Sequence, residues 1–161
     1  MDGVKGKSAT WWLLVAVGLY VVTLDQLTKG LVRSRLDPGE VLRVAGTFSI
    51  ALFRNPGIAG GGLAGHAVTM SLLATVAVAS LLFFLARVRV LDRPVLTGFG
   101  LVIGGGLGNL VDRVRLGYVT DFILRGNSAF NLADVAILAG TMLILVGLVT
   151  TFLRPRLRTA S

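Results

Sequence analysis

Residues 132–153 read LADVAILAGTMLILVGLVTTFL, an apolar run in which Asp134 is the only charged side chain. A helix of about 20 apolar residues is long enough to cross the hydrocarbon core of a bilayer. Three further apolar runs cover about residues 11–32, 68–86 and 95–111. The pattern predicts an all-α membrane protein with four transmembrane helices, built as a single integral membrane domain over residues 1–161.

The composition agrees with a bilayer as the surrounding solvent. Hydrophobic residues make up 54% of the chain and charged residues only 15%, too few to coat a soluble domain of this size. The absence of cysteine excludes disulfides and thiol nucleophiles, and the single histidine, His66, argues against a His-based zinc site or a Ser-His triad. Carboxylates remain as the candidate catalytic groups, and we expect no metal and no cofactor.

The flanks of the four runs indicate an orientation. The N-terminal tail, the short loop at residues 87–94 and the C-terminal tail are all rich in lysine or arginine, and four spans place them on one side. Basic flanks favour the cytoplasm, so both termini are expected there. The longer loops, at about 33–66 and 112–131, then face outward. Arginines that weaken the contrast are Arg33, Arg35, Arg43, Arg54, Arg113, Arg115 and Arg125.

The net charge of +8 fits the same picture. Most basic side chains flank apolar runs, where they anchor helices and face anionic head groups. No nucleic-acid partner is therefore expected.

The first outer loop contains a strand signal. Residues 47–52 alternate small or polar with large apolar side chains, which is the period of a half-buried strand. Residues 54–57 (RNPG) then indicate a turn, and the glycines at 60–62 a flexible stretch. We predict a small extracytoplasmic β-element in this loop, lying on the membrane surface.

Polar side chains gather at the outer ends of the predicted spans. An ionisable group deep in a bilayer costs roughly 2.5–3.5 kcal/mol on insertion scales, so several at one depth indicate a functional cluster. The residues concerned are Asp25, Gln26, Lys29, Asn55, Asn109, Asp112, Arg113, Asp121, Asn131 and Asp134.

Simpler structural roles remain open for several of these residues. Asp25 and Lys29 have the spacing of an i,i+4 acid–base pair on a helix surface. Asn131 and Asp134 have the spacing of a helix N-cap and an acidic residue near the positive end of the helix dipole. Asp112 is best explained as marking the end of the third span.

Glycines in the third run have a regular spacing. Gly100, Gly104 and Gly108 recur every four residues and so share one helix face. Small residues at that spacing let another helix backbone approach closely. Close packing is the interpretation that we favour for these three positions.

Two aspartates suggest more than packing. Asp121 lies in an apolar setting, and Asp134 begins the fourth span. Gly126 and Asn127 lie between them, so the chain can turn back and bring the two carboxyl groups together. Paired carboxylates in a partly dry site share a proton, and one can then deprotonate water while the other polarises a scissile carbonyl. Spacing alone is a weak signal for such a pair.

Five short blocks, in order along the chain, resemble those of the lipoprotein signal peptidases (signal peptidase II), bacterial aspartyl proteases of the cytoplasmic membrane. The blocks are DQLTK (25–29), RNPGIA (54–59), GGLGNLVDR (105–113), VTDF (119–122) and FNLAD (130–134). The resemblance covers essentially the whole chain. Two departures are the glycines at 60–62, where an aromatic residue is usual, and Thr120, where a valine is common.

The resemblance implies that Asp121 and Asp134 are the catalytic dyad of an aspartic endopeptidase. The residues implied to orient the dyad, bind the substrate backbone or support the site are Asp25, Lys29, Asn55, Asn109, Arg113 and Asn131. The implied substrate is a prolipoprotein carrying a diacylglyceryl-cysteine, cut just before that cysteine near the extracytoplasmic face. Membrane lipid is the other implied partner. Because the helix dipole favours ionised Asp134, we expect Asp134 to be the base.

Two other classes of protein remain as alternatives. A small proton-coupled membrane transporter would also place carboxylates in a four-span bundle, but it would need one near the bilayer midplane, where these spans have none. A structural or assembly protein would explain the glycine face and the basic anchors. It would not explain why Asn, Arg and Asp gather at one depth.

Overall fold

The structure is a computed structural model that describes residues 2–37, 39–57, 67–87 and 92–158. The helices are α1 (Asp2–Arg35), α2 (Ala67–Arg87), α3 (Arg93–Leu116) and α4 (Leu132–Arg158). The strands are β1 (Val41–Ala45), β2 (Phe48–Asn55), β3 (Val119–Arg125) and β4 (Ser128–Phe130). The chain begins and ends with a helix, and one pair of strands follows α1 and another follows α3.

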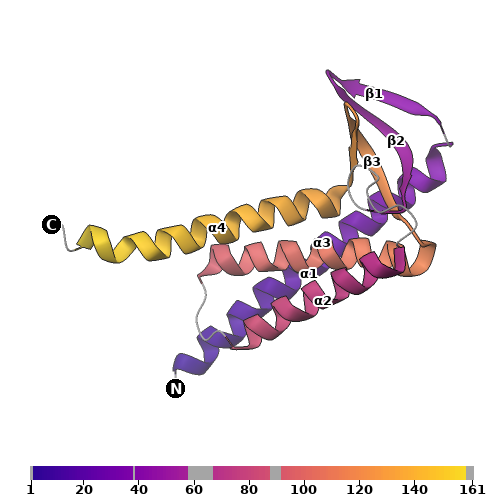
Figure 1. The fold of residues 1–161 in the computed structure, drawn as a ribbon. Helices are drawn as coiled ribbons and strands as arrows, with labels where there is room; N and C mark the ends of the chain where they lie inside the picture. Colours follow the sequence, from indigo (N-terminus) through magenta and orange to yellow (C-terminus); the bar gives the residue numbers. More distant parts are fainter. Residues whose placement is uncertain (1, 38, 58–66, 88–91, 159–161) are drawn as a thin grey trace.

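The helices run side by side, and the sheet lies at one end of them (Figure 1). α1 begins and α4 ends at the opposite end, so the two ends of the chain lie away from the sheet. α3 packs most extensively against α1 and α4, and α2 covers it on a further side. The side of a membrane on which the two ends of the chain lie stays a prediction.

Three of the helices described are long and apolar enough to cross a membrane, over Trp11–Arg35, Arg93–Leu116 and Leu132–Thr150. The apolar segment Leu72–Phe83 within α2 is shorter. The prediction of a multi-pass, mostly helical membrane protein is therefore confirmed. The crossing by α2, and with it the count of four spans, stays a prediction.

Glycines allow the helices to pack closely, as their spacing predicts. A Cβ atom on Gly100 would lie 2.9 Å from the carbonyl oxygen of Leu14, and one on Gly104 would lie 2.7 Å from that of Gly18. Both contacts join α3 to α1. On another side of α3, a Cβ atom on Gly98 would lie 2.7 Å from the carbonyl oxygen of Gly140 in α4. A larger side chain at these positions would push the helices apart.

The sheet is antiparallel, with strand order β1-β2-β3-β4. β2 confirms the strand predicted at 47–52 and extends it to Asn55. The second segment expected to face outward, 112–131, is more ordered than the predicted loop. α3 continues to Leu116, Gly117 ends it in the left-handed conformation (φ 78°), and β3 and β4 then form a hairpin.

The strand β3 was not predicted, because its sequence lacks the alternation of apolar and polar side chains that marks a half-buried strand. Its first four residues, Val119–Phe122, are buried on both faces of the sheet, so apolar and polar side chains do not alternate. On one side, Phe122 packs with Val32 and Leu36 at the end of α1. This packing fixes β3, which carries Asp121, against the helices.

Candidate active site

Asp121 lies on β3, opposite Phe53 of β2, and its side chain is buried. Asn55 Nδ2 donates a hydrogen bond of 2.9 Å to Asp121 Oδ2, and Asn131 Nδ2 donates one of 2.6 Å to Oδ1. The antiparallel pairing of β2 with β3 explains the first contact, because Asn55 is the register partner of Val119, two residues from Asp121 on the same face. Each oxygen of this carboxyl group therefore accepts a bond from an amide.

Asp134 lies at the start of α4, where it takes part in the helix cap. Its backbone N–H donates to Asn131 Oδ1 at 3.0 Å, and the backbone N–H of Asn131 donates to Asp134 Oδ2 at 3.2 Å. This reciprocal pair is a capping box and confirms the predicted N-cap. The other carboxyl oxygen, Oδ1, accepts a bond of 2.8 Å from Asn109 Nδ2 on α3.

Asn131 thus contacts both predicted catalytic carboxyl groups. Its side chain bonds Asp121, and its backbone N–H bonds Asp134. Gly126, in the left-handed conformation at φ 58°, lies at the β3–β4 turn that returns the chain toward β3. The segment therefore turns back as expected and places Asn131 in contact with both aspartates.

Burial governs the protonation of Asp121. Loss of hydration raises the pKa of this carboxyl group from 3.8 to about 6. The hydrogen bond from Asn55 opposes the rise, the negative charge of Asp134 adds to it, and the hydrogen bond from Asn131 and the charge of Lys29 oppose it. Of the two effects that raise the pKa, one comes from the low-polarity setting and the other from the neighbouring carboxylate.

An ionic cluster of Asp25, Lys29 and Asp112 lies beside the pair, between α1 and α3. Lys29 Nζ lies 2.7 Å from Asp25 Oδ2 and 3.5 Å from Asp112 Oδ2, and all three side chains are almost completely buried. The predicted Asp25–Lys29 spacing therefore produces a contact, but inside the protein and not on a helix surface. Buried charges persist in this way only when they are paired.

The ionic cluster is joined to the site by hydrogen bonds. Lys29 Nζ donates to Asn109 Oδ1 at 2.8 Å, which orients the amide of Asn109 so that its Nδ2 points to Asp134. Asp25 Oδ1 accepts from the backbone N–H of Ala133 at 3.0 Å, directly before Asp134. α1 therefore holds the beginning of α4 in position.

Asp112 has a larger role than marking the end of a span. Its Oδ2 accepts a bond of 2.8 Å from the backbone N–H of Thr120, the residue before Asp121. Gln26 Nε2 donates to Asp112 Oδ1 at 3.2 Å, and Arg33 Nη1 donates to Thr120 Oγ1 at 2.7 Å. Asp112 lies three residues after Asn109, so its place on the same helix face is the signal that points to this role.

Arg113 supports the site from a greater distance. Its Nη2 donates to the carbonyl oxygen of Gly57 at 3.1 Å, and the backbone N–H of Gly57 donates to Asn55 Oδ1 at 3.0 Å. Arg113 therefore holds the turn that follows Asn55. Neither catalytic candidate forms a salt bridge with Arg113 or with any other residue described here.

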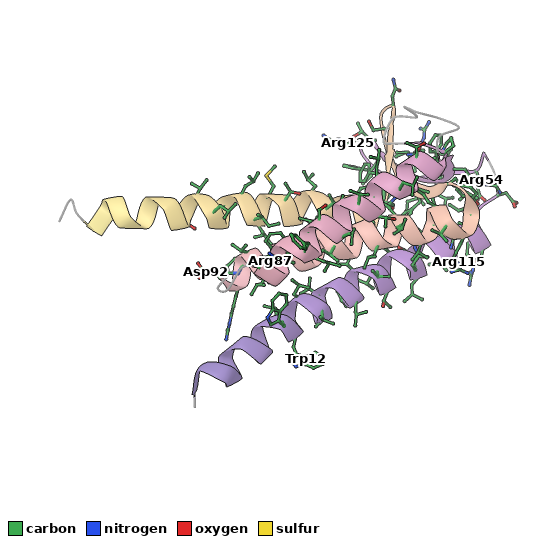
Figure 2. All side chains as sticks on the ribbon, turned by 60° about the horizontal axis from the view of Figure 1, so that its bottom comes forward. Trp12, Arg54, Arg87, Asp92, Arg115 and Arg125 are labelled. Atoms are coloured by element: carbon green, nitrogen blue, oxygen red, sulfur yellow. The ribbon has the colours of Figure 1, made fainter. Side chains whose placement is uncertain are left out.

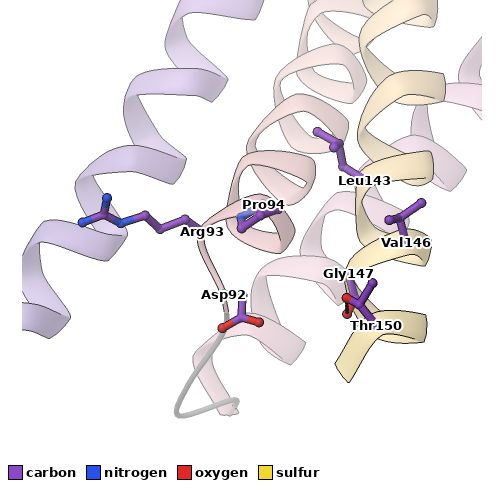
Figure 3. Close-up of a pocket in the computed structure, with 7 residues that line it drawn as sticks. All are labelled: Asp92, Arg93, Pro94, Leu143, Val146, Gly147 and Thr150. Atoms are coloured by element: carbon purple, nitrogen blue, oxygen red, sulfur yellow. Dashed lines mark hydrogen bonds between the residues drawn. The ribbon is translucent and has the colours of Figure 1, made fainter. Parts of the chain in front are cut away.

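The groups that meet at this site are carboxyls and amides. In the described part of the chain, no group of three or more His, Cys, Asp or Glu side chains has an arrangement that could hold a metal ion. The pocket in Figure 3, of about 380 Å³, lies between the start of α3 and α4, at the opposite end from the sheet. It is lined by Asp92, Arg93, Pro94, Leu143, Val146, Gly147 and Thr150, and it includes no predicted site residue.

Solved structures place this fold among those of membrane enzymes. One structure, described as a bacterial membrane enzyme obtained by the in meso method, aligns with a TM-score of 0.79 at 27% identity. The alignment covers 85% of this chain and 87% of that one. A second structure with a similar description aligns with a TM-score of 0.75 at 28% identity, over 84% and 91% of the two chains.

Sequence relatives identify the family. Residues 17–150 match the family described as Signal peptidase (SPase) II. The lipoprotein signal peptidase of Moorella thermoacetica is 42% identical over 136 residues, covering 83% of this chain and 89% of the relative. That of Syntrophus aciditrophicus is 39% identical over 147 residues, covering 84% and 91%. The chain belongs to the signal peptidase II family and is a peptidase, as its sequence blocks predict, and the transporter alternative is not supported.

Proposed function

We propose that this protein removes the signal peptide from prolipoproteins with Asp121 and Asp134 as its catalytic pair. The single observation that carries the proposal is that Asn131 bonds both carboxyl groups, one through its side chain and one through its backbone. Both carboxyl groups are bonded by uncharged amides and not by a cation. The two groups can therefore share one proton. Membership of the signal peptidase II family supports the substrate.

The two carboxyl groups take different roles in the proposed reaction. Asp134, at the positive end of the α4 dipole, is the ionised base that removes a proton from water. Asp121, whose pKa burial raises to about 6, is the acid that polarises the scissile carbonyl oxygen. Water then attacks the carbonyl carbon, the peptide C–N bond breaks, and the proton held by Asp134 passes to the leaving amine.

The surrounding polar residues set the geometry of this pair. Lys29 orients Asn109, and Asn109 holds Asp134. Asn55 holds Asp121, and Arg113 fixes the turn beyond Asn55. Donors of this kind, placed beside an extended substrate, would also bind its backbone.

The proposed substrate carries a diacylglyceryl group on the cysteine that follows the cleaved bond. Such a lipid keeps the cysteine at the level of the head groups, and the carboxyl pair lies where α4 begins, at the sheet end of the helices. In this proposal α2 is the fourth span of a single integral membrane domain in the bacterial cytoplasmic membrane. Both termini are cytoplasmic, and the site opens near the extracytoplasmic face.

The experiment that tests this function uses the purified full chain in lipid and a diacylglyceryl-modified precursor. Mass spectrometry should detect a product shortened by the signal peptide, with the lipidated cysteine as its first residue. The matched control is the same precursor without the lipid, which should be cut far more slowly. Equal cleavage of both precursors would contradict the proposed substrate, and no cleavage of either would contradict the activity.

A further inference from the structure

Arginine side chains surround the sheet end of the molecule without a role in the site. The arginine collar consists of Arg35, Arg43, Arg54, Arg115 and Arg125, all exposed to solvent. Figure 2 shows Arg54, Arg115 and Arg125 at this end, whereas Trp12, Arg87 and Asp92 lie at the other. The collar draws on α1, β1, β2, α3 and β3, so it is not a product of one local sequence.

The collar has few acidic partners. Among the described residues at this end, Asp37 and Glu40 are the exposed acids, because the other carboxylates belong to the ionic cluster or the catalytic pair. The rule for basic flanks favours arginine on the cytoplasmic side, yet the collar lies opposite the end where α1 begins and α4 ends. Its positive charge therefore requires a separate explanation.

Large apolar side chains are exposed beside the collar. β1 is exposed along its whole length, and Val41, Leu42 and Val44 are each about half exposed or more. Phe48, at the start of β2, is also exposed. In Figure 1 the β1–β2 hairpin projects sideways from the ends of the helices, across their direction. A hairpin in that position runs along the surface of the bilayer that the helices cross.

Two collar arginines stack on aromatic rings. Arg125 Cζ lies 5.4 Å from the centroid of Phe48, its register partner on β2, and Arg54 Cζ lies 5.5 Å from that of Tyr118. Stacking uses the flat face of a guanidinium group, and the N–H groups at its edge match the oxygens of a phosphate. Arginine and aromatic side chains paired in this way suit the boundary between lipid and water.

We propose that the arginine collar binds the phosphate groups of anionic phospholipids while the apolar side chains of β1 and Phe48 enter the lipid surface. The partner is the membrane that carries the protein, at the leaflet on which the sheet lies. Charge complementarity supplies the selectivity, and the exposed apolar side chains supply contact with acyl chains. Each arginine near an anionic surface strengthens binding by about fivefold, so loss of three should be readily measured.

The chain contains no cysteine, which allows a clean test with a single label. Val44→Cys carries a nitroxide in the full-length protein reconstituted in bilayers, and its collision rates with oxygen and with a water-soluble nickel complex report its depth. Replacing part of a zwitterionic bilayer with anionic phosphatidylglycerol should raise the oxygen-to-nickel ratio at least twofold. The triple variant Arg43→Gln/Arg54→Gln/Arg125→Gln should lose this change.

Two controls restrict the interpretation. Arg87→Gln is the matched variant, because Arg87 also stacks on an aromatic ring, at 4.5 Å from Phe83, but lies at the other end of the molecule. It should keep the full response to phosphatidylglycerol. Inorganic phosphate added to zwitterionic bilayers should leave the label unmoved, and a response equal to that of the lipid would overturn the membrane as partner.

The remaining outcomes also decide the question. A label that is equally exposed to water in both bilayers, or a response that survives in the triple variant, would overturn the proposal. Circular dichroism verifies that the triple variant keeps its helices. If it does not, the three single variants replace it, each is expected to lose part of the response, and an undiminished response in all three would overturn the proposal.

Discussion

The ionic cluster and the proposed catalytic pair lie side by side, yet their carboxyl groups have different kinds of partner. In the cluster, Lys29 Nζ contacts the carboxylates of Asp25 and Asp112 directly. In the pair, the bonds to Asp121 and Asp134 come from neutral amides and backbone N–H groups. Carboxyl groups in direct contact with a lysine form ion pairs that tie the helices together. Carboxyls bound only by amides can gain and lose a proton, which is what hydrolysis requires.

The largest expected effect is on the cleavage rate when either carboxyl group of the pair is replaced. Asp121→Asn and Asp134→Asn should each lower the cleavage rate by about a thousandfold or more, because an amide cannot transfer the proton. The rate is measured with a lipidated precursor, and circular dichroism should show that both variants keep their helices. Asp37→Asn, at an exposed carboxylate after α1, is the matched control and should cleave at the normal rate. Full activity of either dyad variant would refute the pair.

Substitutions in the ionic cluster should mainly lower the stability of the fold, whereas substitutions in the pair should mainly lower the cleavage rate. Lys29→Met leaves two buried carboxylates without their cation and should lower the free energy of unfolding by about 3–5 kcal/mol. Thermal unfolding in detergent is the measurement. Adding Asp25→Asn to Lys29→Met should recover part of the loss, because one unpaired charge is then removed. A variant with Lys29→Met that unfolds at the normal temperature would show that the cluster is no scaffold.

Asn131 sharpens the comparison because it bonds both aspartates of the pair and no member of the ionic cluster directly; its side-chain amide donates to Asp121 and to Asn109. Asn131→Ala removes both side-chain bonds and the helix cap, and we expect the cleavage rate to fall by about a hundredfold. Asn127→Ala, in the exposed β3–β4 turn, is the matched control and should leave the rate unchanged. Equal rates for the two variants would mean that Asn131 does not position the carboxyls.

The smallest expected effect is a pH dependence of stability. The folded protein binds a proton at Asp121 up to about pH 6, whereas the unfolded chain releases it near 3.8. This contribution is therefore complete below the unfolded pKa and is lost as the pH rises through the folded pKa. Between pH 4 and 7 the Tm of the normal protein should fall a few degrees more than that of Asp121→Asn. Parallel curves would contradict the raised pKa.

Residue spacing predicted some parts of this molecule better than others. The apolar runs predicted the long helices, because a span needs a length of apolar sequence that little else requires. The spacing of Asn131 and Asp134 predicted the cap, and that of Gly100 and Gly104 predicted the close helix contact. These are local patterns, in which the residues that contact each other or share a face are a few positions apart.

The parts that escaped prediction depend on contacts between distant residues. β3 has no alternation because both of its faces are buried at Val119–Phe122, and β1 lies exposed at the edge with no core face to reveal it. The bond from Thr120 to Asp112 joins a strand to a helix end, and no spacing rule anticipates it. The site residues themselves were found through their polarity at one depth and through resemblance. The hydrogen bonds and ion pairs between these residues could be identified only from the three-dimensional structure.

The most direct test of the catalytic pair is whether its two carboxyl groups affect each other's protons. Carbon-13 NMR of labelled aspartate, assigned with Asp121→Asn, measures the pKa of Asp121 in the full-length protein. It should titrate near 6 in the normal protein and at a lower pH in Asp134→Asn, where the repelling charge is gone. An unchanged pKa of Asp121 in that variant would mean that the two groups do not interact, and the proposed mechanism would fail.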